Sequence, residues 1–293
     1  MPNHITAMLE ARDLEAIDKT VYEAPQEELV ARSIFNIKTD VHPGAETYGY
    51  YVMTRTGAAK IIANGADDIP LVDTDLTRHH QPIYSIVDAI TYTVQDIRQA
   101  QMTGQSVDTT KVAVARRAIA EKENSIIFVG DEKVNLKGVV NAEGIQVENA
   151  SKTFAASTPK EIVDLLRVAK GKITTIPGYR HASLDLLLPP KQYELLDQRY
   201  SEYDSRTVLE VLKGHGWFNS IEPVSDLEKQ GTSNTDCFII MDTTPLTCEI
   251  LITMDITRHQ EEYASMKWKV PFEERCGGAV IKAPYAIVRM DGI

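Results

Sequence analysis

The chain has 293 residues, of which 43% are hydrophobic and 25% charged, and its formal net charge is −11. Its length and composition are ordinary for a globular protein of one large domain or two smaller ones. The acidic balance without a basic block argues against sequence-specific binding of DNA or RNA. No run of about 18 apolar residues suggests a membrane span, and the start lacks signal-peptide features, so we expect synthesis in the cytoplasm.

Three cysteines, Cys237, Cys248 and Cys276, are odd in number and far apart. Such spacing is not that of a disulfide framework. A metal site formed with His259 is the alternative, but no pair has the short spacing of a zinc knuckle. We therefore expect buried, reduced thiols and no metal.

Residues 1–46 differ from the rest of the chain, with nine acidic and four basic residues and no sustained apolar stripe. One interpretation is a poorly ordered acidic tail, and the other is an arm that becomes ordered on a neighbouring copy. Residues 34–37 have the composition of a short strand that could join another sheet.

Residues 47–73 are rich in tyrosine and β-branched side chains and are interrupted by glycines, which is typical of a hairpin. Pro70 keeps the returning part extended. The segment has too few large aliphatic residues to form its own core, so the predicted hairpin needs another surface to lie on.

A strand is predicted at residues 81–90, followed by a helix that Thr93 and Asp96 can cap. The strongest helix is predicted at residues 108–128, ending before Gly130. Arg116 and Arg117 belong to its solvated side, as do Glu121 and Glu123. The expected buried face consists of Ala115, Ala118, Ile119, Lys122 and Ile126.

The second half alternates further helices and strands. Thr158, Pro159 and Glu161 form a clear helix start, and Gly171 is the expected end of that helix. Further helices are predicted at residues 191–199 and 206–213. Strands are predicted at residues 184–188, 237–241, 247–254, 266–270 and 278–287. The expected fold class is therefore α+β.

Motifs for catalysis are absent from the sequence: it has neither a glycine-rich phosphate loop nor a Gly-x-Ser-x-Gly elbow. His79 and His80 are neighbours, which point to opposite faces of a strand and make a poor chelate. Asp67–Asp68 and Glu273–Glu274 have the same problem as carboxylate pairs. We expect no cofactor and no enzymatic activity, although an α+β metabolic enzyme remains an alternative because triads assemble from distant residues.

Three segments, taken in order, resemble a known family: residues 114–130 (VARRAIAEKENSIIFVG) with 136–141 (LKGVVN), residues 186–196 (LLLPPKQYELL) and residues 277–287 (GGAVIKAPYAI). They resemble the major capsid proteins of tailed phages with the Hong Kong 97 (HK97-like) fold, in the branch related to encapsulin shell proteins. The resemblance covers about residues 45–293.

The resemblance implies four parts. These are an N-terminal arm (1–46), an extended loop formed by the hairpin (47–77), a peripheral domain with a long spine helix (78–153 with 264–284) and an axial domain (154–263 with 285–293). It also implies contacts between copies, for which the candidates are Tyr48, Tyr50, Tyr51, Arg55, Lys60, Asp67, Asp68, Arg116 and Arg117.

The implied function is a major capsid protein that assembles through pentamers and hexamers into an icosahedral shell around a viral genome. Expected partners are other copies, portal, scaffold or decoration proteins, and loosely held packaged DNA, with no membrane. Many relatives carry an N-terminal scaffolding segment that a protease removes. We do not expect such a segment in this chain, and therefore expect a separate scaffold protein or none. The alternative is an encapsulin-like compartment. Cross-linking through Lys60, known in some relatives, is not expected.

Overall fold

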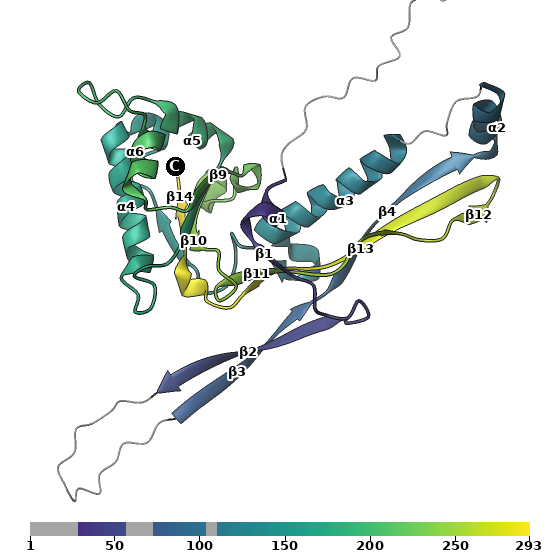
Figure 1. Cartoon of the computed structure of the whole chain (residues 1–293), viewed down its shortest axis with the longest axis horizontal. Helices are drawn as coiled ribbons and strands as arrows, with labels where there is room; N and C mark the ends of the chain where they lie inside the picture. The colour runs from purple at the N-terminus through teal and green to yellow at the C-terminus, as the bar shows by residue number, and fades with distance from the viewer. Residues whose placement is uncertain (1–28, 57–72, 104–109) are drawn as a thin grey trace, which may run out of the picture.

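The computed structural model describes residues 29–56, 73–103 and 110–293. Within these ranges the chain forms two five-stranded sheets, a long two-stranded hairpin and a short strand pair, with helices packed against both sheets (Figure 1). No helix in this part of the chain is both long and apolar enough to cross a membrane. The mixture of helices and antiparallel strands confirms the α+β class.

The first sheet has the order β1-β11-β13-β12, and β4 pairs with the other side of β13. Only the β1–β11 pair among these is parallel. The strands are β1 (Asn36–Lys38), β4 (Tyr84–Thr93), β11 (Cys248–Arg258), β12 (Glu262–Ala264) and β13 (Lys267–Ile281).

Strand β13 is one element where the sequence predicted two, at 266–270 and 278–287. It runs unbroken through Glu273, Glu274 and Arg275, where charged residues suggested a gap. Its buried residues alternate at Val270, Phe272, Glu274 and Cys276, as a half-buried strand requires. Glu274 therefore occupies a core-facing position.

Helix α3 (Thr110–Phe128) covers this sheet, and α2 (Val94–Thr103) precedes it (Figure 1). Thr93 and Asp96 exchange both hydrogen bonds of the predicted cap. The predicted buried face of α3 is wrong in part: Ala118 and Lys122 are exposed, whereas Glu123 is buried. Glu123 faces inward because a cation from another element reaches it, as described below.

The second sheet has the order β7-β14-β10-β8-β9. Its strands are β7 (Gln146–Asn149), β8 (Leu184–Leu188), β9 (Ser220–Pro223), β10 (Cys237–Asp242) and β14 (Ile287–Asp291). Strands β8 and β10 are buried on both faces. Leu186 and Ile240 point into the helix-covered core, while Leu187 and Ile239 point into a core shared with the first sheet.

Three helices pack on the outer side of the second sheet: α4 (Pro159–Thr174), α5 (Pro190–Glu194) and α6 (Val208–His215) (Figure 1). The capping box of Thr158 and Glu161 is confirmed. The predicted end of this helix at Gly171 is wrong, because α4 continues to Thr174 and buries Ile173. Helix α5 is also shorter than the predicted 191–199, and a 3₁₀ turn continues it.

Sheet membership divides the chain differently from the predicted domain boundaries. Strands β11 and β12 lie within the predicted axial range 154–263, yet they pair with β13 of the first sheet. Strand β7 lies within the predicted peripheral range 78–153, yet it pairs with β14 of the second sheet. Pairing partners far along the chain decide these memberships.

The hairpin consists of β2 (Thr47–Thr56) and β3 (Asp73–Pro82), paired from Thr47↔Pro82 to Thr56↔Asp73. It projects from the body of the molecule (Figure 1). Its second strand extends well beyond the predicted limit at residue 77, and the predicted strand at 81–90 becomes β4. Strand β3 ends at Pro82 and β4 begins at Tyr84, and Ile83 between them is buried.

The described part of the predicted arm, residues 29–46, packs on its own chain. Helix α1 (Ala31–Ile34) lies against α3, and β1 adds to the edge of β11, which confirms the strand expected near residues 34–37. Phe35 is buried, with its ring centroid 5.9 Å from that of Phe128. The part before residue 29 lies outside the described residues. A short pair, β5 (Gly130–Asp131) and β6 (Leu136–Lys137), follows α3.

Candidate assembly surface

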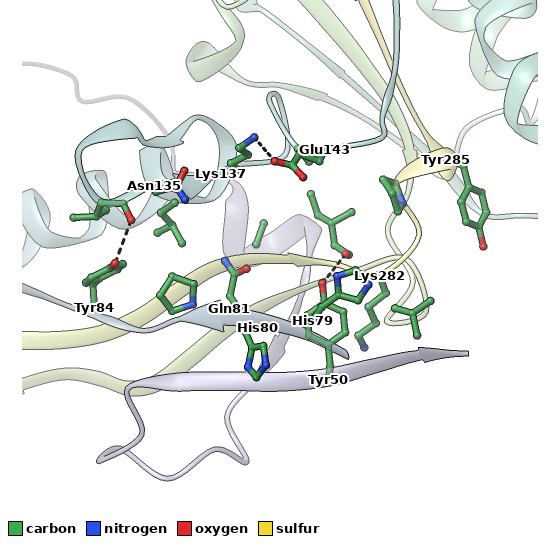
Figure 2. A pocket seen from close by; sticks show the side chains of 18 residues that line it. Tyr50, His79, His80, Gln81, Tyr84, Asn135, Lys137, Glu143, Lys282 and Tyr285 are labelled. Atoms are coloured by element: carbon green, nitrogen blue, oxygen red, sulfur yellow. Dashed lines mark hydrogen bonds and ion pairs between the residues drawn. The ribbon is translucent and has the colours of Figure 1, made fainter. Parts of the chain in front are cut away.

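The base of the hairpin is fixed to the first sheet by side chains of both strands (Figure 2). The Tyr50 hydroxyl donates to the Ile281 carbonyl at 3.0 Å, and the Gln81 amide donates to the Gly277 carbonyl at 2.7 Å. Tyr48 stacks on Tyr50, and both pack against Ile83, Leu251 and Val280. Burial raises the pKa of Tyr50, which keeps its hydroxyl a donor.

A second clamp holds the segment that leads into the hairpin. The guanidinium of Arg275, on β13, donates to the carbonyls of Pro43 at 2.5 Å and Ala45 at 3.1 Å. Arg275 thus ties two backbone carbonyls to the same strand that receives Tyr50 and Gln81. The direction in which the hairpin leaves the body is fixed by these contacts.

Beyond its base, the hairpin presents apolar side chains to solvent. Tyr51 is 61% exposed and Leu76 is 59% exposed, with Met53 also exposed. The Arg78 guanidinium lies 5.8 Å from the centre of the Tyr51 ring. A two-stranded ribbon is marginal on its own, and exposed apolar side chains grouped together mark an interaction surface. This outer hairpin, residues 51–53 and 74–78, is the candidate assembly surface.

A groove of about 710 Å³ lies beside the hairpin base, between the loop at residues 134–143 and the end of β13 (Figure 2). Its cations are already paired: Lys137 with Glu143 at 2.7 Å and Lys282 with Glu249 at 2.5 Å. The groove is also lined by four aromatic side chains, those of Tyr50, His79, Tyr84 and Tyr285. The groove therefore suits a neutral or apolar segment better than an ion.

The predicted contact residues do not form one cluster. Tyr48 and Tyr50 contact their own chain, whereas Tyr51 is exposed. Arg55 lies in β2 opposite Thr74, and its side chain is outside the description. Lys60, Asp67 and Asp68 lie outside the described residues.

The two predicted arginines lie on α3, away from the hairpin (Figure 1). Arg117 pairs with Glu121 at 2.7 Å. Arg116 is exposed and lines a second groove, of about 410 Å³, whose other walls are largely apolar.

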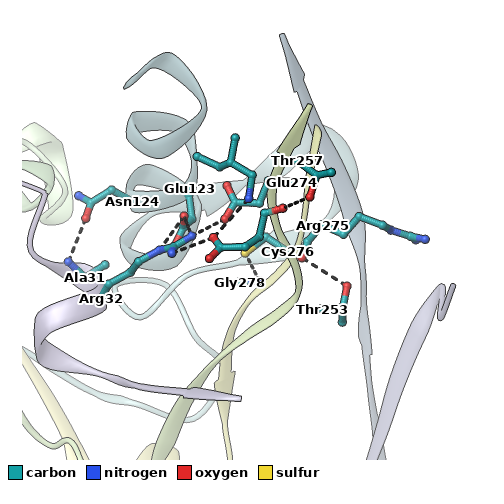
Figure 3. A network of polar contacts seen from close by, with 12 residues as sticks. Ala31, Arg32, Glu123, Asn124, Thr253, Thr257, Glu274, Arg275, Cys276 and Gly278 are labelled. Atoms are coloured by element: carbon teal, nitrogen blue, oxygen red, sulfur yellow. Dashed lines mark hydrogen bonds and ion pairs between the residues drawn. The ribbon is translucent and has the colours of Figure 1, made fainter. Parts of the chain in front are cut away.

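An ionic cluster with two buried glutamates was not predicted from the sequence (Figure 3). Arg32 on α1 reaches Glu123 on α3 at 2.7 Å, Glu274 on β13 at 2.6 Å and Asp255 on β11 at 3.0 Å. Burial, together with the neighbouring Glu123, raises the pKa of Glu274 to about 8. The alternation along β13 was the available signal, because it assigns one member of the Glu273–Glu274 pair to the core.

The predictions for the Glu273–Glu274 pair and for the burial of the three cysteines are confirmed. Glu273 and Glu274 point to opposite faces of β13: Glu273 bonds Ser85 and His259, while Glu274 bonds Arg32. Cys237, Cys248 and Cys276 are free and buried, and burial raises the pKa of each thiol to about 12. Within the described ranges, no group of three metal-ligating side chains comes together.

Comparison with known proteins supports a shell-forming chain. Residues 57–293 match the family model described as major capsid protein. The type 1 encapsulin shell protein of Myxococcus xanthus is 26% identical over 143 residues, and the alignment spans about half of each protein, 48% of this chain and 49% of the relative.

Solved capsid structures share the fold at low identity. The capsid of Myoviridae phage XM1 gives a TM-score of 0.83 at 12% identity and covers 98% of this chain and 100% of that one. The structure from Mycobacterium phage Bobi has a TM-score of 0.68 at 11% sequence identity, and the match covers 97% of this chain and 98% of that one. The virus-like particle from Pyrococcus furiosus has a TM-score of 0.62 at 16% sequence identity, and the match covers 88% of this chain and 91% of that one.

Proposed function

Because the chain belongs to the major capsid protein family and has the Hong Kong 97 fold, we propose that its copies gather into pentamers and hexamers that close into an icosahedral shell around a viral genome. Its family and fold are those of structural proteins. The function is then geometric, since many modest interfaces between identical copies add up to a closed particle.

The observation that carries this proposal is the outer hairpin. Its base is locked to the body by Tyr50 and Gln81, while Tyr51 and Leu76 remain exposed beyond it. A rigidly aimed ribbon with uncovered apolar side chains is suited to lie over an adjacent copy. We assign Tyr51, Arg55, Lys60, Asp67 and Asp68 to that contact, and Tyr48 and Tyr50 to the anchor.

The arginines of α3 are proposed as a second contact with a neighbouring copy. Arg116 is exposed beside an apolar groove, and arginine is enriched at protein interfaces. Arg117 supports the same helix surface through its ion pair with Glu121. This contact is independent of the hairpin.

The other proposed partners follow from the role of a shell subunit. Portal, scaffold and decoration proteins would bind the assembled surface. Packaged DNA would be held loosely. Tight binding needs many cationic side chains that displace the counterions of the phosphates, and this chain has a net charge of −11. The protein would be made in the host cytoplasm and reside in the virion.

An encapsulin-like compartment is the second candidate, and the 26% identity to an encapsulin shell protein favours it. The two candidates share one fold, so the genes beside this one distinguish them. Terminase and portal genes would indicate a phage, whereas a gene for a peroxidase or a ferritin-like protein would indicate a compartment.

Electron microscopy and sedimentation of the purified protein test the proposal. We expect closed particles far larger than a tetramer, in a salt series and with any partner scaffold present. A monodisperse small oligomer under all of these conditions would contradict it.

Deletion of residues 57–65 tests the role assigned to the hairpin. The shortened protein should keep the circular dichroism and cooperative unfolding of the full chain but yield few particles, because its body contacts are intact. If the deletion unfolds the subunit instead, the hairpin belongs to the core and our assignment is wrong.

A further inference from the structure

A row of side chains along α3 joins two hollows in the surface. Val112, Arg116 and Ala120 are spaced four residues apart, so they follow one another on the same side of the helix. Ala120 and Leu29 both line a small cavity of about 60 Å³. Val112 and Arg116 line the groove of about 410 Å³ described above. Leu29, where the described part of the chain begins, therefore lies beside the helix row that leads into the groove.

The course of the chain near α1 points toward this groove. Helix α1 lies against the C-terminal part of α3, where the Ala31 N–H donates to the Asn124 side chain at 3.0 Å (Figure 1). Two residues earlier in the chain, Leu29 shares its cavity with Ala120, one turn nearer the start of α3. Because a helix rises 1.5 Å per residue, the groove begins about 6 Å farther along the axis, at Arg116. The residues just before Leu29 are therefore within reach of the groove.

The groove combines an apolar floor with a cationic rim. Its floor includes Ile90, Val270 and Phe272, which belong to the small buried cluster between α3 and the first sheet. The charged side chains among its described lining residues are those of Arg116 and Arg258, and both are exposed. This positive rim stands out in a chain whose net charge is −11. The groove therefore suits a segment that carries both apolar and acidic side chains.

The residues before Leu29 have this composition. Residues 21–28 (VYEAPQEE) contain three glutamates and no cation, and they start with an adjacent valine and tyrosine. Pro25 disfavours a helical conformation at the residue before it, which favours an extended course. An extended chain spans about 3.3 Å per residue, so Tyr22 can lie up to about 23 Å from Leu29. Val112, at the far end of the groove row, is only about 12 Å from Ala120 along the helix.

We propose that residues 21–28 dock in this groove of their own chain. Tyr22 then lies on the apolar floor, and the last two glutamates lie beside Arg116. The chain's own segment is the favoured occupant because Leu29 holds it next to the groove, which gives it a high effective concentration there. A docked segment becomes part of the α3 surface proposed above as a contact with a neighbouring copy. The docking itself concerns a single chain, so it can fail without the proposed shell failing.

A disulfide trap in the full-length protein tests the docking. In the variant A24C/V112C, one new thiol is in the segment and the other is in the groove, so mild oxidation should link them within one chain. Non-reducing gel electrophoresis and peptide mapping distinguish this link from one between chains. The matched control is A24C/V168C, because Val168 is an exposed valine on α4, beside the second sheet. The three native cysteines are buried in both variants and should not compete.

Charge reversal tests the cationic rim. Adding R116E to A24C/V112C should slow formation of the intrachain link by about threefold to fivefold at low salt, since attraction to the glutamates becomes repulsion. Adding R167E, which reverses an exposed arginine on α4, should leave the rate unchanged. If V112C prevents folding, cleavage after Glu23 by a glutamate-specific protease replaces the trap, and R116E alone should be cut faster than the wild-type protein and R167E.

Three results would overturn the proposal. The first is an intrachain link no more frequent in A24C/V112C than in A24C/V168C. The second is a link that forms only between chains, which would make a second copy the occupant of the groove. The third is an equal effect of R116E and R167E on the measured rate, because the rim arginine would then have no special role.

Discussion

At the scale of single residues, the body of this chain combines an apolar core with a few buried charges whose partners lie far away in sequence. Arg32 meets Glu123 across 91 positions and Glu274 across 242. A buried ion pair gives uncertain net stability, but losing one partner is costly because the other charge stays buried. The fixed geometry around Arg32 therefore matters more than the number of its bonds.

The substitution Arg32→Ala should destabilise the subunit by about 2–3 kcal/mol, because the buried Glu123 would lose its cation. Urea unfolding at neutral pH measures this loss as a lower midpoint. Arg167→Ala is the matched control: its side chain is 61% exposed and pairs within one helix with Asp164, so about 0.5 kcal/mol or less is expected. Equal losses in the two variants would show that the cluster adds nothing.

Residue type alone predicted some of these positions and not others. The three cysteines were correctly expected to be buried and unpaired, because their spacing argued against disulfides and metal binding. The burial of Glu123 could not be inferred from helical periodicity, which treats glutamate as a surface residue. The decisive partner, Arg32, lies in a segment whose sequence predicted an arm or a tail.

At the scale of elements, local signals predicted beginnings better than ends. The caps at Thr93 and Thr158 formed as expected, since a cap depends on residues within one turn. The end of α4 was misplaced at Gly171, because tertiary packing of Ile173 carries the helix past a residue of low propensity. Similarly, β13 continues through three charged residues because neighbouring strands pair with it on both sides.

Two glycines with different surroundings test this explanation. Gly171→Ala should stabilise the protein by about 0.5–1 kcal/mol, because the site is inside α4 and nothing lies within 4 Å of the added Cβ. Gly138→Ala should destabilise it by more than about 2 kcal/mol, since its Cβ would lie 2.4 Å from the Phe128 carbonyl oxygen. Thermal unfolding of both variants measures the difference. A loss of stability in Gly171→Ala would mean that the helix needs glycine there.

At the scale of the whole molecule, the first sheet and the hairpin extend away from the second sheet and the helices that cover it (Figure 1). The sequence predicted the fold through its resemblance to phage capsid proteins, and it located the hairpin. Neither the anchor at Tyr50 nor the ionic cluster at Arg32 could be predicted, because both depend on β13 contacts more than 200 positions away. Contacts between copies join residues of two different chains, so local patterns in one sequence do not predict them.

Assembly should depend on salt in a direction set by the net charge. Each copy carries a formal charge of −11, so bringing many copies together is opposed by their mutual repulsion. Raising NaCl from about 20 mM to about 300 mM shortens the Debye length from roughly 20 Å to below 10 Å, which should increase the assembled fraction at fixed protein concentration. Light scattering and sedimentation measure that fraction, and sucrose at matched osmolality is the control for changes in water activity. If salt instead dissociates the particles, ion pairs between copies outweigh the overall repulsion, and Arg116 would be the first described residue to substitute with alanine.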